Sequence, residues 1–225
     1  VPYLDGFRLV LLDHRGRGRS DRPAVVAQHA IEEYVADVVA VLDELAVERC
    51  GFVGYSMGAQ IGQLLAASHP QRVSALVALG VTRDRVPDPL GEAAFAAEVR
   101  SHGMVRLVDE VEREERIVLP VWLRDQFLET DREQFALGVE AMAAWTPWAI
   151  HASIRCPALL VAGELEDPAR RNGEAAALMV RGAAAWLPGL GHVGAFLAAE
   201  QQCRLFVPHL RRALPAVSHA ARSHS

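Results

Sequence analysis

Short apolar runs alternate with amphipathic stretches along much of the chain, and each run has the length of a strand buried on both faces. We predict strands at residues 7–12, 49–53, 73–79, 158–163 and 183–187. Between and after them, apolar residues recur at helical spacing, which predicts helices near residues 31–45, 57–68, 173–180 and 194–210. This alternation indicates an α/β fold, with a mainly parallel sheet and flanking helices.

The alternation stops between residues 82 and 152, where the sequence is helical and more charged. A charged run at residues 110–116 falls in this region, and we interpret it as a solvated helix face. We therefore predict a core formed by residues 1–81 and 153–225, with residues 82–152 inserted into it as a helical unit.

The composition and net charge argue against membranes and nucleic acids as partners. No apolar run approaches the roughly 20 residues of a membrane-spanning helix, and the net charge of −5 disfavours nucleic acid and anionic membrane surfaces as partners. The three cysteines are widely spaced, which fits reduced thiols in a cytoplasm better than a disulfide framework or a metal site. We expect a cytoplasmic protein that acts on a small molecule without a metal or cofactor, in an oligomeric state that the sequence leaves open.

The stretch GFVGYSMGA carries the first chemical signal. Ser56 follows a predicted strand and precedes a predicted helix, so it occupies a sharp turn that exposes its hydroxyl. We expect the small residues Gly54, Gly58 and Ala59 to let strand and helix approach closely. The backbone N–H of Met57, at the helix N-terminus, is then directed at a developing oxyanion. Ser56 is our candidate nucleophile.

A serine nucleophile needs a base, and His192 is the strongest candidate. It lies in a glycine-rich loop directly after the last predicted strand. Loops that follow parallel strands share one edge of the sheet, so this loop and Ser56 are expected to meet. His14, after the first predicted strand, is a weaker candidate because its neighbours suggest a structural loop.

The base in turn needs a carboxylate, and residues 164–167 supply three after another predicted strand. The order serine, acid, histidine is the order expected of this fold type. The pattern leaves open which carboxylate acts, and Asp84, after the third predicted strand, is a more remote possibility.

With these motifs in place, the chain resembles the α/β-hydrolase superfamily, in particular its cap-bearing esterase- and lactonase-like members. Residues 13–20 resemble the family's D-x-R-G-x-G-x-S structural loop, residues 54–58 its nucleophile elbow, and residues 154–192 its acid-bearing strand and histidine loop. The resemblance implies that residues 82–152 form a cap over the site. It also places the acid three residues after the strand-end glycine, at Glu166, or at Asp167 if the loop shifts by one residue.

This sequence departs from the family pattern at its N-terminus. Family members begin with further strands and a loop, often containing His-Gly, that supplies a second oxyanion N–H. In the family's sheet order, one of those strands lies between the strands predicted here at residues 7–12 and 49–53. We therefore expect an interior gap there, and we interpret the chain as an incomplete version of a longer enzyme. As given, it is expected to be poorly soluble or inactive.

The function expected from these features is hydrolysis of a small, fairly apolar ester or lactone by a serine triad. Trp145 and Trp148 either line the substrate pocket or pack the cap onto the core. A serine at the elbow, in place of aspartate, argues against the epoxide-hydrolase and dehalogenase chemistries of the superfamily. Alternatives are a non-catalytic binding protein on this fold, or a perhydrolase or carbon–carbon bond hydrolase with the same triad. The arginines of residues 15–19 belong to the structural loop rather than to a nucleic-acid segment.

Overall fold

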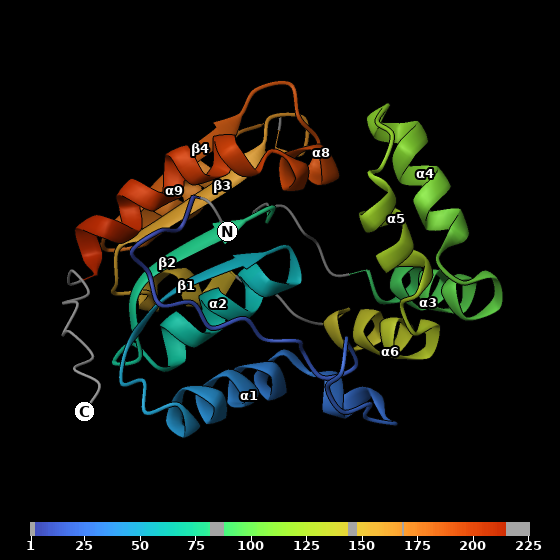
Figure 1. The fold of residues 1–225 in the computed structure, drawn as a ribbon, viewed down its shortest axis with the longest axis horizontal. Coiled ribbons are helices and arrows are strands. Elements are labelled where there is room, and N and C mark those ends of the chain that lie inside the picture. The colour runs from blue at the N-terminus through green and yellow to red at the C-terminus, as the bar shows by residue number, and fades with distance from the viewer. Residues whose placement is uncertain (1–2, 82–87, 144–147, 168, 215–225) are drawn as a thin grey trace, which may run out of the picture.

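A computed structural model describes residues 3–81, 88–143, 148–167 and 169–214 of the chain. Its centre is a parallel sheet of four strands in the order β1-β2-β3-β4 (Figure 1). The strands are β1 (Cys50–Tyr55), β2 (Val73–Leu79), β3 (Ala158–Gly163) and β4 (Gly182–Leu187). β2 and β3 lie in the middle of the sheet and are buried on both faces, which explains their continuous apolar sequence.

Helices cover the two faces of this sheet and form two apolar cores with it. One face packs against α1 (Ile31–Glu44), α2 (Met57–Ser68) and α7 (Asn172–Leu178), and the other against α9 (Ala199–Ala213). Alternate residues of β2 enter opposite cores, with Leu76 on the α2 side and Val77 on the α9 side. The predicted α/β fold with a mainly parallel sheet is confirmed.

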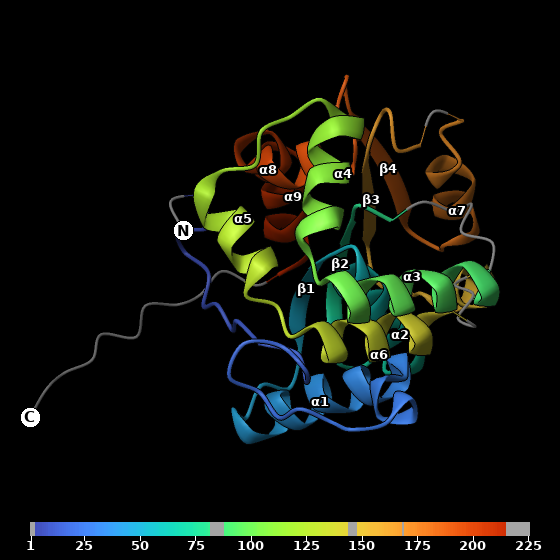
Figure 2. The same cartoon turned by 90° about the vertical axis from the view of Figure 1, so that its right-hand side faces the viewer.

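Four helices between β2 and β3 lie beyond the carboxyl ends of the strands (Figures 1 and 2). They are α3 (Pro89–His102), α4 (Val105–Glu115), α5 (Val121–Leu128) and α6 (Arg132–Met142). We call these four the intervening helices. The helical character predicted for residues 82–152 is therefore present in the part of this range that the structure describes.

Short 3₁₀ helices occur at η1 (Val26–His29) and η2 (Trp148–Ser153).

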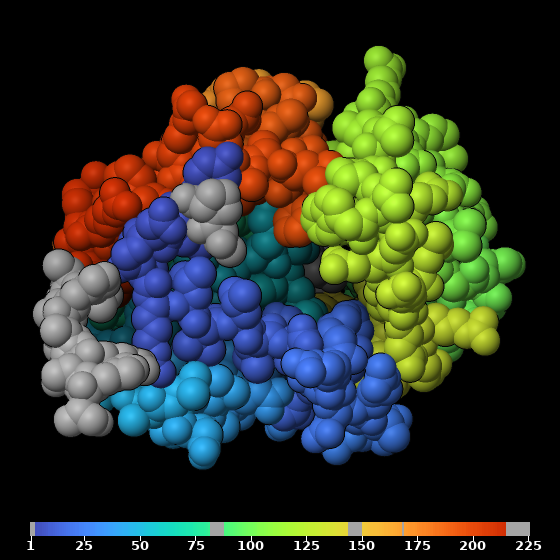
Figure 3. All heavy atoms as spheres, viewed as in Figure 1, coloured from blue at the N-terminus to red at the C-terminus, as the bar shows by residue number. Residues whose placement is uncertain are grey.

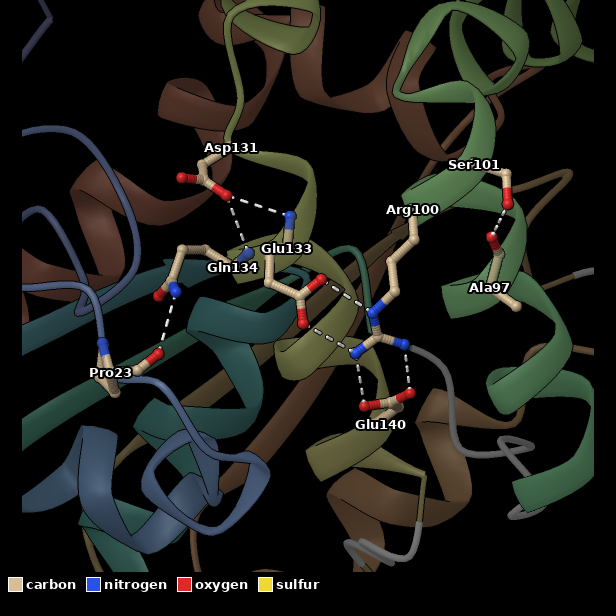
Figure 4. A network of polar contacts seen from close by, with 8 residues as sticks. All are labelled: Pro23, Ala97, Arg100, Ser101, Asp131, Glu133, Gln134 and Glu140. Carbon is tan, nitrogen blue, oxygen red and sulfur yellow. Dashed lines mark hydrogen bonds and ion pairs between the residues drawn. The ribbon is translucent and has the colours of Figure 1, made fainter.

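Polar contacts join the intervening helices to one another and to the N-terminal loop (Figure 4). The Arg100 guanidinium of α3 donates to the carboxylates of Glu133 and Glu140 on α6, with two of these hydrogen bonds at 2.9 Å. The side-chain amide of Gln134 donates to the backbone oxygen of Pro23 at 2.9 Å. The paired α3 and α6 are thus fastened to the loop that follows residue 12.

The strand predicted at residues 7–12 does not form, and that prediction was wrong. In the described part of the chain the sheet ends at β1, and a hollow of about 1860 Å³ lies between β1 and residues 4–12. In Figure 3 the blue N-terminal segment lies in front of a recess in which teal atoms of the core are visible. Strands pair only when their axes lie about 4.8 Å apart, so the hollow keeps residues 7–12 out of a ladder. The gap expected at this place is present.

The last predicted helix is two helices, α8 (His192–Leu197) and α9, separated at Ala198. His192 is consequently the first residue of a short helix rather than part of the preceding loop. Among the helices of the described residues, none combines the length and hydropathy that crossing a membrane requires.

Candidate active site

Ser56 occupies a strained turn between β1 and α2. Its φ of 52° and ψ of −118° place a non-glycine residue in a sparsely populated backbone region. Its N–H donates to the carbonyl oxygen of Leu79 at 2.8 Å, and its own carbonyl accepts from Ala59 at 2.9 Å. These bonds to the next strand and to the first turn of α2 hold the unusual conformation in place.

The two glycines of the turn differ in their surroundings. A Cβ at Gly54 would lie 2.1 Å from the carbonyl oxygen of Gly58, so only glycine allows this approach of β1 to α2. A Cβ at Gly58 would meet nothing within 4 Å. Close packing therefore explains Gly54 as expected, but the expectation that Gly58 must be small for the same reason was wrong.

Met57 is the first residue of α2, so its backbone N–H has no acceptor within the helix. The turn places this donor immediately after the Ser56 side chain. An N–H at a helix N-terminus carries partial positive charge and favours a developing oxyanion. The geometry of the turn is compatible with the predicted role of Met57.

His192 contacts one of the two carboxylates that the sequence left open. Its Nδ1 lies 2.7 Å from Oε1 of Glu166, and the Glu166 side chain is only 12% exposed. An ionised carboxylate only accepts hydrogen bonds, so Nδ1 carries the proton and Nε2 of the neutral ring is left as an acceptor. This is the tautomer that a general base requires.

Asp167 has different partners, although it is the next residue. Its buried carboxylate accepts from the backbone N–H groups of Arg171 (2.9 Å) and Asn172 (3.0 Å), and from the indole of Trp186 (2.9 Å). It therefore fixes the start of α7 against β4. No hydrogen bond joins it to His192 among the described residues, and Glu166 is the carboxylate that we carry forward.

Tyr55 ties the serine turn to the histidine helix, a role that the sequence analysis missed. Its hydroxyl donates to the backbone oxygen of His192 at 2.6 Å, and the two rings have centroids 5.3 Å apart. Burial, and secondarily the nearby carboxylates of Glu166 and Glu115, raise the pKa of Tyr55, so the hydroxyl stays protonated as a donor. An aromatic residue next to the nucleophile was the available signal in the sequence.

Ser56 and His192 lie at the same edge of the sheet but are not hydrogen-bonded to each other in the described structure. Tyr55, the residue before Ser56, is in direct contact with His192, so the serine turn and α8 meet through this tyrosine. Hydrogen bonds between nucleophile and base are often long without substrate and shorten when substrate binds. The structure brings together the histidine and one acid of the predicted set, and Ser56 lies at the same edge of the sheet.

The hollow beside β1 extends to the serine turn, where Ser56 and Met57 line it. Near this end the intervening helices contribute Phe95 and Phe135, whose rings meet edge to face 6.1 Å apart. These aromatic residues were not among the predicted substrate contacts. The predicted contacts Trp145 and the side chain of Trp148, like Asp84, lie outside the described residues.

The loop at residues 13–20 is held by contacts with α1 and α6. Arg15 forms a two-pronged ion pair with Asp37 of α1, both distances being 2.6 Å, and the Arg17 guanidinium lies over the Phe135 ring. The ring of His14 meets Tyr34 edge-on, and burial lowers the pKa of His14. These contacts agree with the structural role expected of the loop.

No cluster of histidine, cysteine and acidic side chains suited to a metal occurs in the part of the chain that the structure describes.

Comparison with known proteins decides the family. The family model described as "alpha/beta hydrolase fold" matches residues 1–172, which is more than half of the sequence. The chain belongs to this family. The enol-lactonase of Burkholderia xenovorans LB400 is one similar α/β hydrolase, with a TM-score of 0.75 and 28% sequence identity, over 88% of this chain and 79% of that one.

Curated relatives match a shorter stretch. "Putative carbamate hydrolase RutD" of Caulobacter sp. (strain K31) is 42% identical over 84 residues, which is 37% of this chain and 30% of the relative. "Epoxide hydrolase B" of Mycobacterium tuberculosis (strain ATCC 25618 / H37Rv) is 40% identical over 76 residues, 34% of this chain and 21% of the relative. The aligned region thus spans less than a third of these α/β hydrolases, whose names cover different chemistries.

Proposed function

We propose that the protein is a serine hydrolase that cleaves a small, fairly apolar carboxylic ester or lactone through an acyl-enzyme at Ser56. The observation that carries this proposal is the hydrogen bond of 2.7 Å between His192 Nδ1 and Glu166, at the sheet edge where Ser56 occupies its strained turn. A serine here differs from the aspartate that epoxide-hydrolase chemistry uses, so we do not transfer that activity from the relative.

In the proposed reaction, the Ser56 hydroxyl oxygen attacks the substrate carbonyl carbon while His192 Nε2 takes the hydroxyl proton. The negative charge that develops on the carbonyl oxygen is stabilised by the N–H of Met57. His192 then returns the proton to the leaving alkoxide, and the acyl group remains on Ser56. A water molecule, activated by the same imidazole, releases the acid and regenerates the serine.

Glu166 orients the imidazole and stabilises the imidazolium that forms in each half of the reaction. Its 12% exposure favours a strong interaction, because water competes little with a buried carboxylate. The phenyl rings of Phe95 and Phe135 line the hollow near Ser56 and favour an apolar substrate over a highly charged one.

The test is covalent labelling with a serine-reactive fluorophosphonate, read by intact-protein mass spectrometry. It is applied to the 225-residue chain and to a version that carries any sequence preceding Val1 in its natural context. We expect one label per molecule, none after Ser56→Ala, and about 10⁴-fold slower ester turnover after Glu166→Gln. Absence of labelling in both versions, or labelling that survives Ser56→Ala, contradicts the proposal and favours a non-catalytic binding protein.

A panel of short-chain esters, thioesters and lactones then identifies the substrate class. We expect the highest kcat/KM among uncharged acyl groups of a few carbons. A preference for phosphorylated or strongly anionic substrates would contradict the substrate part of the proposal while leaving the nucleophile intact.

A further inference from the structure

The segment that carries His192 is rich in glycine. Gly189 has a φ of +67°, and Gly191 and Gly194 flank the histidine closely. Glycine loses more conformational entropy on ordering than any other residue, so this segment needs external contacts to hold one geometry. From the core, Tyr55 holds the His192 carbonyl and Glu166 holds its ring.

A third contact comes from outside the core. Glu115, the last residue of α4, accepts hydrogen bonds from the backbone N–H groups of Val193 and Gly194, one on each carboxylate oxygen and both at 2.8 Å. A Cβ at Gly191 would lie 2.7 Å from the Glu115 carboxyl carbon, so glycine at this position admits the carboxylate. The two donors directly follow His192 in the sequence.

The surrounding contacts show that this is a built interface. Val108 and Val111 precede Glu115 on one face of α4, at spacings of three and four residues. This face packs, with Leu119 and Leu123, against Val193 of α8 in a separate apolar cluster. The charged run at residues 110–116, predicted to be a solvated face, is therefore solvated only in part: Glu115 points into the molecule.

We propose that Glu115 is a positioning residue for His192. By accepting the two N–H groups that follow the histidine, its carboxylate ties the imidazole to the intervening helices. His192 then keeps its alignment with Ser56 only while α4 and α5 are packed on α8. This proposal rests on the proposed function, in which His192 is the base, and adds a residue 77 positions away in the sequence to its control.

The position of Glu115 has an electrostatic consequence as well. In the described structure the titratable groups in contact with the His192 segment are Glu166, Glu115, Tyr55 and Glu164, the last of which accepts from the Gly189 N–H at 3.0 Å. Tyr55 stays neutral and Glu164 is ion-paired with Arg170 at 2.7 Å, so Glu166 and Glu115 are the carboxylates without an arginine partner among the described residues that favour the imidazolium. Removing the charge of Glu115 makes the imidazolium that forms during the proposed reaction less favourable.

The kinetic test uses Glu115→Ala and Glu115→Gln in the full chain, with Glu114→Gln as the matched control. Glu114 lies on the same helix but is exposed, so its substitution changes the same charge without touching α8. We expect Glu115→Ala to lower kcat about 10²-fold with KM nearly unchanged, as for a misplaced catalytic group. The acid limb of the kcat/KM profile moves to lower pH in both Glu115 variants and stays in place in Glu114→Gln.

A second measurement does not depend on activity. Hydrogen exchange of the Val193 and Gly194 amides, followed by NMR, is compared in wild type, Glu115→Gln and Glu114→Gln. Faster exchange only in Glu115→Gln supports the structural part of the proposal, that Glu115 holds the His192 segment, and it does so even if fluorophosphonate labelling has excluded the hydrolase. Unchanged exchange overturns the contact, and faster exchange with unchanged kcat and acid limb in an active enzyme overturns the positioning role.

Discussion

The two glycines that flank Ser56 predict opposite effects of the same substitution. In Gly54→Ala the new Cβ would lie 2.1 Å from the Gly58 oxygen and 2.3 Å from its carbonyl carbon, whereas real contacts of a Cβ are not shorter than 3.0 Å. The atoms in the way are backbone, so β1 and α2 have to separate by roughly 1 Å. We expect a loss of about 3 kcal/mol in the free energy of unfolding, the upper end of typical overpacking costs.

In Gly58→Ala the new methyl group meets nothing within 4 Å. Gly58 is the second residue of α2, and its φ is not positive, so alanine fits the helix. Replacing a helical glycine by alanine stabilises by about 0.5–1 kcal/mol, mainly because the unfolded chain loses conformational freedom. The two variants therefore differ by about 3.5–4 kcal/mol although each adds one methyl group to the same turn.

Urea unfolding followed by circular dichroism measures this difference. With an m-value near 3 kcal/mol/M, the midpoints of the two variants are separated by more than about 1 M, with wild type between them. Equal shifts for both variants would refute the steric argument. So would a Gly54→Ala protein within about 0.5 kcal/mol of wild type, because the strand and helix would then separate at almost no cost.

Three substitutions near the site and in the intervening helices give further expectations. Asp167→Asn removes the charge of the buried carboxylate that accepts from the first N–H groups of α7. Thermal denaturation should therefore show a loss of about 2 kcal/mol in the free energy of unfolding, with the kcat of the folded enzyme retained. A lower kcat without a loss of stability would contradict this role. Tyr55→Phe leaves the His192 carbonyl without its donor, and steady-state kinetics should show kcat lowered about fivefold; an unchanged kcat contradicts the contact. Hydrogen bonding to Arg100 lowers the pKa of Glu140 in the folded protein. The ion pair therefore contributes its full stabilisation above pH 4.5, the ordinary pKa of this carboxyl group, and loses it as the pH falls through the lower pKa of the folded state. Arg100→Met should therefore cost about 0.5–1 kcal/mol in urea unfolding at pH 7 and less at pH 3; an equal cost at both contradicts the ion pair.

Local sequence pattern was sufficient for the central elements. The bounds predicted at residues 57–68, 73–79 and 158–163 are those of α2, β2 and β3, because apolar runs and a terminating proline mark them without help from distant residues. Residues 7–12 have the same apolar pattern but form no strand. Such a pattern reports a preference for burial, whereas a strand also requires a neighbour at hydrogen-bonding distance.

The site was predictable as far as residue types and chain order allow. Glu166 and Asp167 are adjacent carboxylates, and their different partners depend on where α7 and β4 lie, which the loop sequence does not encode by itself. Glu115 could not be predicted for a related reason. Its charge indicates a solvent-exposed side chain, but the backbone N–H groups that it contacts belong to a segment far along the chain. Its spacing from Val108 on α4 was the local signal.

The open edge of β1 has a consequence for handling the protein in solution. In the described residues β1 pairs only with β2, and the side chains of Leu9, Leu11 and Val53 are exposed beside its free edge. An uncovered apolar strand edge is a template for pairing with a strand of another molecule. We therefore expect self-association through this edge to rise with protein concentration. Rates measured on concentrated stocks would report a mixture of species, so dilution series belong with every kinetic comparison between variants.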